Sequence, residues 1–176
     1  MTPTKKLAVI AMLVAQASVL HYMESLLPNP IPIPGVKLGL ANIITLLALV
    51  LFDFKTAVNI SVLRTILGAM LSGTLFGVGF FMSFSGALAA VCMMALLLSV
   101  SSGFSLVGVS IAGAIAHNLG QLAMAALILN FSGIFYYLPI MLLSSIPTGI
   151  ITGLLLVELV KYLKANNRLD NYFQDL

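Results

Sequence analysis

The stretch Ile43-Ile44-Thr45-Leu46-Leu47-Ala48-Leu49-Val50-Leu51 is an almost unbroken apolar run. It does not alternate between apolar and polar residues, as the strand of a membrane β-barrel would. Other windows of the chain approach or exceed the roughly 20 apolar residues that a helix needs to cross the hydrocarbon core of a bilayer. The sequence therefore predicts an all-α, polytopic membrane protein.

The composition of the whole chain supports this prediction. Of its 176 residues, 61% are hydrophobic and only 7% are charged, whereas soluble domains carry about 25% charged residues. The net charge of +3 does not point to nucleic acid, because the basic residues lie at predicted helix ends, where membrane topology explains them. The single cysteine, Cys92, lies in an apolar run and is expected to be a small buried side chain.

The apolar segments are separated by clusters of proline, glycine and polar residues, which predict about six transmembrane helices. The expected spans are residues 6–27, 36–52, 56–75, 80–100, 106–130 and 136–162. They form a single transmembrane domain over residues 1–164, followed by a short cytoplasmic tail at 165–176. Between the first two spans, Pro28-Asn29-Pro30-Ile31-Pro32-Ile33-Pro34-Gly35 predicts a stiff, extended, lid-like loop, because each proline fixes its own φ and restrains its predecessor.

The N-terminal segment could also be a signal peptide. Lys5 and Lys6 precede an apolar run and the small residues around Gln16, as at a cleavage site. Apolar character nevertheless continues to Leu27, and cleavage would leave an odd number of spans. We therefore expect the first helix to be retained.

The basic residues predict an orientation. One side of the predicted membrane protein carries Lys5, Lys6, Lys55, Lys161, Lys164 and Arg168, and the other side carries Lys37. Cytoplasmic loops are enriched in Lys and Arg. We therefore expect a cell-membrane protein with both termini in the cytoplasm, and with the proline-rich loop and Lys37 facing outward.

Polar side chains inside the predicted spans are the candidate site residues, because such groups are costly in a membrane and tend to face a cavity or the bundle interior. With Lys37, the candidates are Glu24, Asn42, Arg64, His117, Asn118 and Gln121. Helix rise places those of the first two spans in the outer half of the membrane and the others near its middle. Together they could line one pocket that opens outward beneath the proline-rich loop.

Other interpretations of these residues stay open. Glu24 could reach water at the interface, and His21 could be a packed histidine. Asn118 could serve as hydrogen-bonding glue between helices. By helix rise, Glu24 lies roughly two to three turns above Arg64, so a direct pair would need a tilted or displaced helix, and a bound ligand spanning the gap is favoured.

Small residues spaced four apart can let helices approach closely. The pairs that show this spacing are Ala11 with Ala15, Gly73 with Gly77, and Gly149 with Gly153. No aspartate-rich magnesium motif, glycine-rich phosphate loop or metal-ligand spacing is present in the sequence. We therefore expect a chain that is not an enzyme, with no catalytic residues, metal or cofactor.

The segment from Pro32 to Ile43, with the string Pro34-Gly35-Val36-Lys37-Leu38-Gly39-Leu40-Ala41-Asn42, resembles the Gx transporter family, also labelled heptaprenyl diphosphate synthase component I. Glu24, Arg64 and His117-Asn118 fit the same pattern. That family is similar to the substrate-binding S components of energy-coupling-factor transporters. The resemblance implies a six-helix bundle with an outward-facing site under the first loop, which docks through small residues of its first helix, here Ala11 and Ala15, onto a transmembrane coupling subunit driven by ATPases.

The leading hypothesis is a membrane-embedded substrate-binding subunit of an uptake transporter, surrounded by lipid, for a small amphipathic or anionic molecule. Arg64, His117 and Lys37 would supply positive or donor groups, and Glu24 would orient one of them or bind a substrate amine. Asn42 and Gln121 would add neutral hydrogen bonds. The alternatives are a non-catalytic membrane component of polyprenyl diphosphate or quinone synthesis, and a membrane partner in a redox or flavin-handling assembly.

Overall fold

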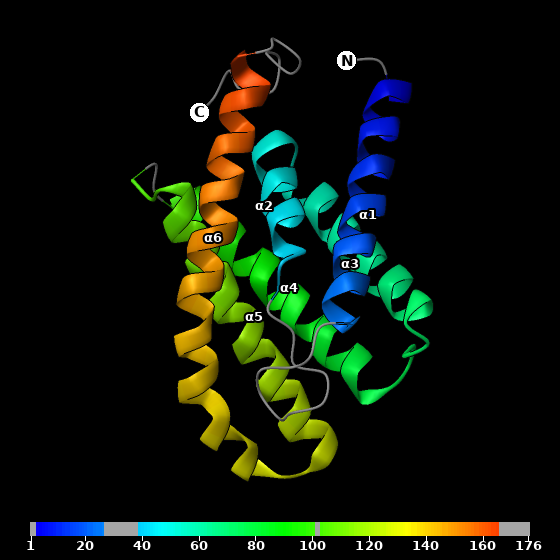
Figure 1. Cartoon of the computed structure of the whole chain (residues 1–176), viewed down its shortest axis with the longest axis vertical. Coiled ribbons are helices and arrows are strands. Elements are labelled where there is room, and N and C mark those ends of the chain that lie inside the picture. The colour runs from blue at the N-terminus through cyan, green and yellow to red at the C-terminus, as the bar shows by residue number, and fades with distance from the viewer. Residues whose placement is uncertain (1–2, 27–38, 101–102, 166–176) are drawn as a thin grey trace.

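The computed structural model describes residues 3–26, 39–100 and 103–165. In this part of the chain it contains six α-helices and no strand. Five of the helical segments are long and apolar enough to cross a membrane. The prediction of an all-α, polytopic membrane protein is therefore confirmed (Figure 1).

The helix bounds follow the predicted spans closely, with one exception. The helices are α1 (Pro3–Leu26), α2 (Asn42–Leu51), α3 (Phe54–Leu71), α4 (Val78–Val100), α5 (Leu106–Leu129) and α6 (Leu138–Ala165), and a 3₁₀ helix, η1 (Ser132–Tyr137), precedes α6. The tail predicted at residues 165–176 lies outside the described residues, apart from the last residue of α6.

The exception is α2, because the predicted start of this span at residue 36 is wrong. Residues 36–38 lie outside the described part, and the chain at residues 39–41 turns before α2 begins at Asn42. Gly39 has a φ of +83°, in the left-handed region that a residue with a side chain rarely adopts. Asn42 N donates to Gly39 O over 2.9 Å. With 10 residues, α2 is too short to cross a bilayer and begins inside the molecule.

The basic helix ends lie together at one end of the bundle. In Figure 1 the start of α1 and the end of α6 are both at the top. The turn between α2 and α3 joins them there, because Lys6 Nζ lies 3.7 Å from Asp53 Oδ2 and 5.6 Å from the centre of the Phe52 ring. The clustering of the described basic residues agrees with the predicted pattern, while the side of the membrane that this end faces stays a prediction.

Glycines set the closest helix packing. A Cβ atom at Gly149 would lie 2.5 Å from Ile111 Cα, and one at Gly153 would lie 2.7 Å from Val107 Cα. These distances leave no room for a side chain, so α6 packs directly on the backbone of α5 and this predicted seam is confirmed. The prediction of a helical seam at Gly73 and Gly77 is wrong, because α3 ends at Leu71.

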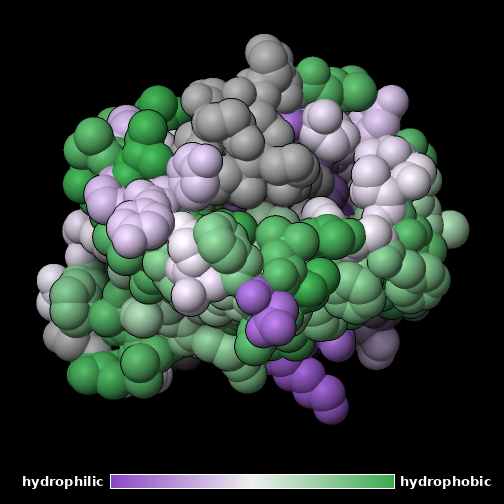
Figure 2. All heavy atoms as spheres, turned by 90° about the horizontal axis from the view of Figure 1, so that it is seen from below, coloured by the Kyte–Doolittle hydropathy of each residue, from purple (hydrophilic) through white to green (hydrophobic). Residues whose placement is uncertain are grey.

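The outer surface of the described part is largely apolar. Large apolar side chains are exposed along α1, α3, α4, α5 and α6. Figure 2, which looks at the end opposite the start of α1 and the end of α6, shows mostly hydrophobic and weakly polar residues with a few hydrophilic ones. Cys92 is exposed rather than buried, because it lies on the outer face of α4. Lipid would cover such a surface in a bilayer.

Candidate functional site

Seven polar side chains that the sequence placed inside the spans are at least nine-tenths buried. Arg64 is 1% exposed, and the most exposed member of the group, Asn42, is 7% exposed. The group is His21, Glu24, Asn42, Arg64, His117, Asn118 and Gln121. His21, Glu24 and Arg64 therefore do not project to the surface of the described part of the chain.

Residues 40 and 42, at the start of α2, hydrogen-bond to the two buried charges. Glu24 Oε1 accepts a hydrogen bond from Leu40 N over 2.8 Å, and Arg64 Nη2 donates to Asn42 Oδ1 over 2.8 Å. Leu40 and Asn42 are two residues apart, so their Cα atoms are separated by about 7 Å at most.

α1 and α3 run side by side from the same end, since Lys6 Nζ lies 3.7 Å from Asp53 Oδ2 and His21 packs against Gly68. Glu24 therefore lies level with the end of α3, about two helical turns from Arg64, as helix rise predicts. A ligand that spans this gap stays a prediction.

His117 and Gln121 extend this cluster onto α5. Gln121 Nε2 lies 3.1 Å from His117 Nε2. A Cβ atom at Gly39 would lie 2.9 Å from Asn42 Nδ2 and 3.5 Å from His117 Cδ2. The absence of a side chain at Gly39 thus lets the start of α2 approach the imidazole, and links Asn42 to α5.

Gly86 performs a similar role on α4. A Cβ atom there would lie 2.8 Å from Gln121 Cγ and 3.1 Å from His117 Cε1. His21 packs against Gly68, which lies one turn beyond Arg64 on α3. His21 and Glu24 therefore both face α3, as their spacing of three residues predicts.

Asn118 lies apart from this cluster. Its Nδ2 donates to Met141 O over 2.9 Å and to Ser145 Oγ over 2.7 Å, both on α6. Ser110 and Thr152 make a second hydrogen bond of 2.8 Å between the same two helices. These contacts favour the interpretation that Asn118 joins α5 to α6 by hydrogen bonds, rather than lying beside Arg64 in a binding site.

Several buried polar atoms in the interior have no hydrogen-bond partner within the part of the chain that the structure describes. They are Asn42 Nδ2, Thr45 Oγ1, Ser61 Oγ, Arg64 Nε, Ser83 Oγ and Asn118 Oδ1. The first four come from the facing α2 and α3, where Thr45 and Ser61 lie three residues from Asn42 and Arg64 respectively. Sequence reasoning missed Ser61 and Ser83, because serine is common in membrane helices, where it bonds its own backbone.

The remaining candidates lie elsewhere. Lys37 is outside the described residues. Ala11 and Ala15 are exposed on the outer face of α1, and Ala15 lines a shallow hollow of about 470 Å³ together with Gln16 and Ile44. No group of three or more His, Cys, Asp or Glu residues in the described ranges is placed to hold a metal ion.

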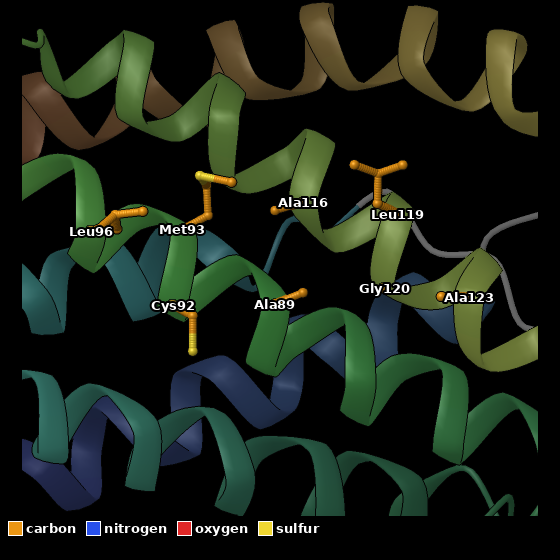
Figure 3. Close-up of a pocket in the computed structure, with 8 residues that line it drawn as sticks. All are labelled: Ala89, Cys92, Met93, Leu96, Ala116, Leu119, Gly120 and Ala123. Atoms are coloured by element: carbon orange, nitrogen blue, oxygen red, sulfur yellow. The ribbon is translucent and has the colours of Figure 1, made fainter.

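A second shallow groove, of about 460 Å³, lies between α4 and α5. Figure 3 shows that each helix contributes four of the lining residues. They are Ala89, Cys92, Met93, Leu96, Ala116, Leu119, Gly120 and Ala123. None carries a charge, so this groove offers no polar recognition and differs in kind from the buried cluster.

Comparison with known proteins gives one result. The model of the family described as heptaprenyl diphosphate synthase component I matches residues 13–159. This range includes Glu24, Asn42, Arg64, His117 and Gln121. No curated protein and no solved structure gave a match.

Proposed function

The chain belongs to the heptaprenyl diphosphate synthase component I family, and we propose that it is the substrate-binding subunit of a small-molecule uptake transporter. It is a helical membrane component, and its substrate is a small amphipathic or anionic molecule. In this role the chain binds but does not catalyse. The proposed site consists of Glu24, Asn42, Arg64, His117 and Gln121, with Lys37 as a further proposed contact.

The observation that carries this proposal is the buried, incompletely bonded guanidinium of Arg64. A buried ion pair is weak evidence for stability, since well-packed apolar residues often serve as well or better. Ionisable groups at membrane depth commonly mark a substrate or ion pathway. Arg64 Nε and Asn42 Nδ2 have no protein partner in the described part of the chain, and such atoms require an explanation by water, an ion or a ligand.

The proposed location is the cell membrane, with both termini in the cytoplasm. Under this orientation the start of α2 and the Arg64 cluster are reached from outside, on the side of the segment that joins α1 to α2. The Lys and Arg asymmetry of the sequence supports this arrangement.

The proposed protein partner is a transmembrane coupling subunit that works with ATPases. Ala11 and Ala15 offer a docking face, since small residues let membrane helices approach closely. Their exposure on α1 is what such a face requires.

A second candidate function follows from the family description. The chain could serve as a non-catalytic membrane component of polyprenyl diphosphate synthesis, because the matching family is described as a component of heptaprenyl diphosphate synthase. Neighbouring genes discriminate between the two. Genes for coupling and ATPase subunits favour transport, whereas a gene for a soluble prenyl transferase favours synthesis.

The direct test is mass spectrometry of small molecules that co-purify with the full chain in mild detergent. We expect wild-type protein to retain a small molecule that Arg64→Ala loses and Arg64→Lys retains in part, because an ammonium lacks the planar fork of a guanidinium. Lys161→Ala is the matched control, since Lys161 is a cation in an exposed pair with Glu158. Equal retention by wild type and Arg64→Ala, with both eluting as folded protein, would remove Arg64 from the site.

A further inference from the structure

Two unpartnered donors sit on either side of one hydrogen bond. Arg64 Nη2 donates to Asn42 Oδ1 over 2.8 Å, while Arg64 Nε and Asn42 Nδ2 have no partner in the described ranges. Covalent geometry places these two donors no more than about 7 Å apart. Both side chains are more than nine-tenths buried. An oxygen acceptor placed beside this pair would satisfy either donor or both.

The described residues of the cluster hold one buried cation, Arg64, and one buried carboxylate, Glu24. Both hydrogen-bond to the start of α2, at Asn42 and Leu40, which are two residues apart. Glu24 is held in place by the 2.8 Å hydrogen bond from Leu40 N. A further net charge at this depth would lack a counter-charge and would be costly to bury.

A neutral acceptor has no such cost. A carbonyl oxygen that enters the cluster loses its hydrogen bonds to water and regains them from the unpartnered donors. Thr45 Oγ1, also unpartnered, lies three residues from Asn42 on the same helix and can donate to a second acceptor atom. The pattern of unpartnered donors beside one buried cation and one buried carboxylate therefore matches an uncharged, oxygen-bearing group.

We propose that the site takes a ligand whose buried polar group is uncharged and presents a carbonyl-type oxygen to Arg64 Nε and Asn42 Nδ2. This inference rests on the proposed substrate-binding function and narrows its substrate class. Of the two proposed substrate classes, an amphipathic molecule fits this inference. A molecule that buries a carboxylate or phosphate against Arg64 does not.

Three probes with the same heptyl tail test whether the buried polar group must be uncharged: octanamide, octanoate and heptylammonium. Each is titrated into the full chain in a non-ionic detergent, and the shift in Tm gives an apparent Kd. We expect octanamide to raise Tm and to bind at least about tenfold more tightly than either ion, a difference of about 1.4 kcal/mol. Asn42→Leu should remove the octanamide shift, with its folded state checked by its elution profile.

The variant Glu24→Gln tests more specifically whether the Glu24 charge sets the preference for an uncharged ligand. Glutamine keeps an oxygen that can accept from Leu40 N, but leaves Arg64 without its counter-charge. We expect this variant to prefer octanoate over octanamide by at least about tenfold. If the preference for octanamide did not reverse in Glu24→Gln, the inference that the buried charges select an uncharged group would be contradicted.

In the wild type, octanoate binding as tightly as octanamide, or no shift with octanamide, would overturn the inference. The proposed function would still stand if wild type retained a co-purifying molecule that Arg64→Ala lost. If no molecule co-purified, the proposed function would fail as well.

Discussion

Arg64 is the residue on which the site depends. It is buried in α3, and its Nη2 donates to Asn42, the first residue of α2. Glu24, from α1, accepts from Leu40 N just before that helix. The two buried charges are therefore both anchored at the start of α2. Because the guanidinium keeps its charge at physiological pH, its contacts cannot be relaxed by losing a proton, and the partners must be held in place by the fold.

The sequence allowed the buried polar residues of the candidate site to be identified from their types, but it did not predict which of them contact one another. A charge inside an apolar span marks Glu24 and Arg64 wherever the helices pack. The contact between Arg64 and Asn42 instead depends on the turn at Gly39, whose positive φ is a property of the folded backbone. Asn118 has the same residue type as Asn42 but faces α6, and a difference of orientation on a helix cannot be read from residue type.

Asp53 provides a prediction at the helix end remote from the site. Its carboxylate accepts from Thr56 N over 2.7 Å and caps α3. This backbone hydrogen bond, with a smaller contribution from Lys6, holds the pKa of Asp53 below its usual value. The stabilisation is therefore present above the unfolded pKa and is lost as pH falls through the folded pKa.

We expect Asp53→Ala to reduce stability by about 1 kcal/mol at neutral pH, as loss of a helix cap does, and less in acid. Asp53→Asn should keep most of the cap and lose the pH dependence. Melting in detergent between pH 7 and pH 3 measures both variants. A penalty for Asp53→Ala that does not shrink in acid would show that the carboxylate charge is not involved.

Among the helices, α2 contributes most to the site because it starts inside the molecule. Its first turn presents Asn42, and Leu40, just before it, donates its backbone N–H to the Glu24 carboxylate. The sequence predicted the end of this helix well, since Asp53 breaks the apolar run. It did not predict the start, because Val36 to Ala41 are mostly apolar and local composition there is compatible with a helix.

The two glycine pairs show that residue spacing does not by itself predict where helices pack closely. Gly149 and Gly153 lie against the backbone of α5, whereas Gly73 lies after the end of α3 with a φ of +67°. Both pairs have identical spacing. Which of them becomes a seam depends on where a helix stops, and spacing alone does not carry that information.

The α1 face around Ala11 and Ala15 carries the docking proposal. We expect Ala11→Leu and Ala15→Leu to weaken co-purification with a membrane partner, because added bulk separates the backbones and loses dispersion contacts. The melting temperature of the isolated chain should stay near that of wild type, since both positions are exposed. Met12→Leu, on the exposed surface and similar in volume, is the matched control. If Ala11→Leu and Ala15→Leu both recover as much partner as wild type does, this face is not the docking surface.

At the scale of the whole molecule, the basic residues at the described helix ends gather at one end of the bundle, whereas Arg64 is buried between the helices. The sequence predicted this gathering because the number of spans fixes which loops share a side. The fold does not by itself decide which side of the membrane this end faces, so the orientation needs a direct measurement.

Cysteine labelling measures the orientation, in a Cys92→Ala background that removes the native thiol. Tyr136 is 90% exposed in η1. In Figure 1 the segment before α6 lies at the end of the bundle opposite the start of α1. Lys55 lies in the first turn of α3. We expect Tyr136→Cys to react with an impermeant thiol reagent on intact cells, and Lys55→Cys to react only after permeabilisation. The reverse pattern would place the proposed site on the cytoplasmic side.

We infer that the buried charges of Glu24 and Arg64 are retained for binding rather than for stability. Removing one buried charge leaves the other uncompensated, so Arg64→Met alone should cost about 3–5 kcal/mol. In the double variant Glu24→Gln with Arg64→Met, neither buried charge remains and an acceptor for Leu40 N is kept. We expect this double variant to melt within a few degrees of wild type and to carry no co-purifying small molecule. A double variant that is as stable as wild type and retains the same bound molecule would contradict this inference.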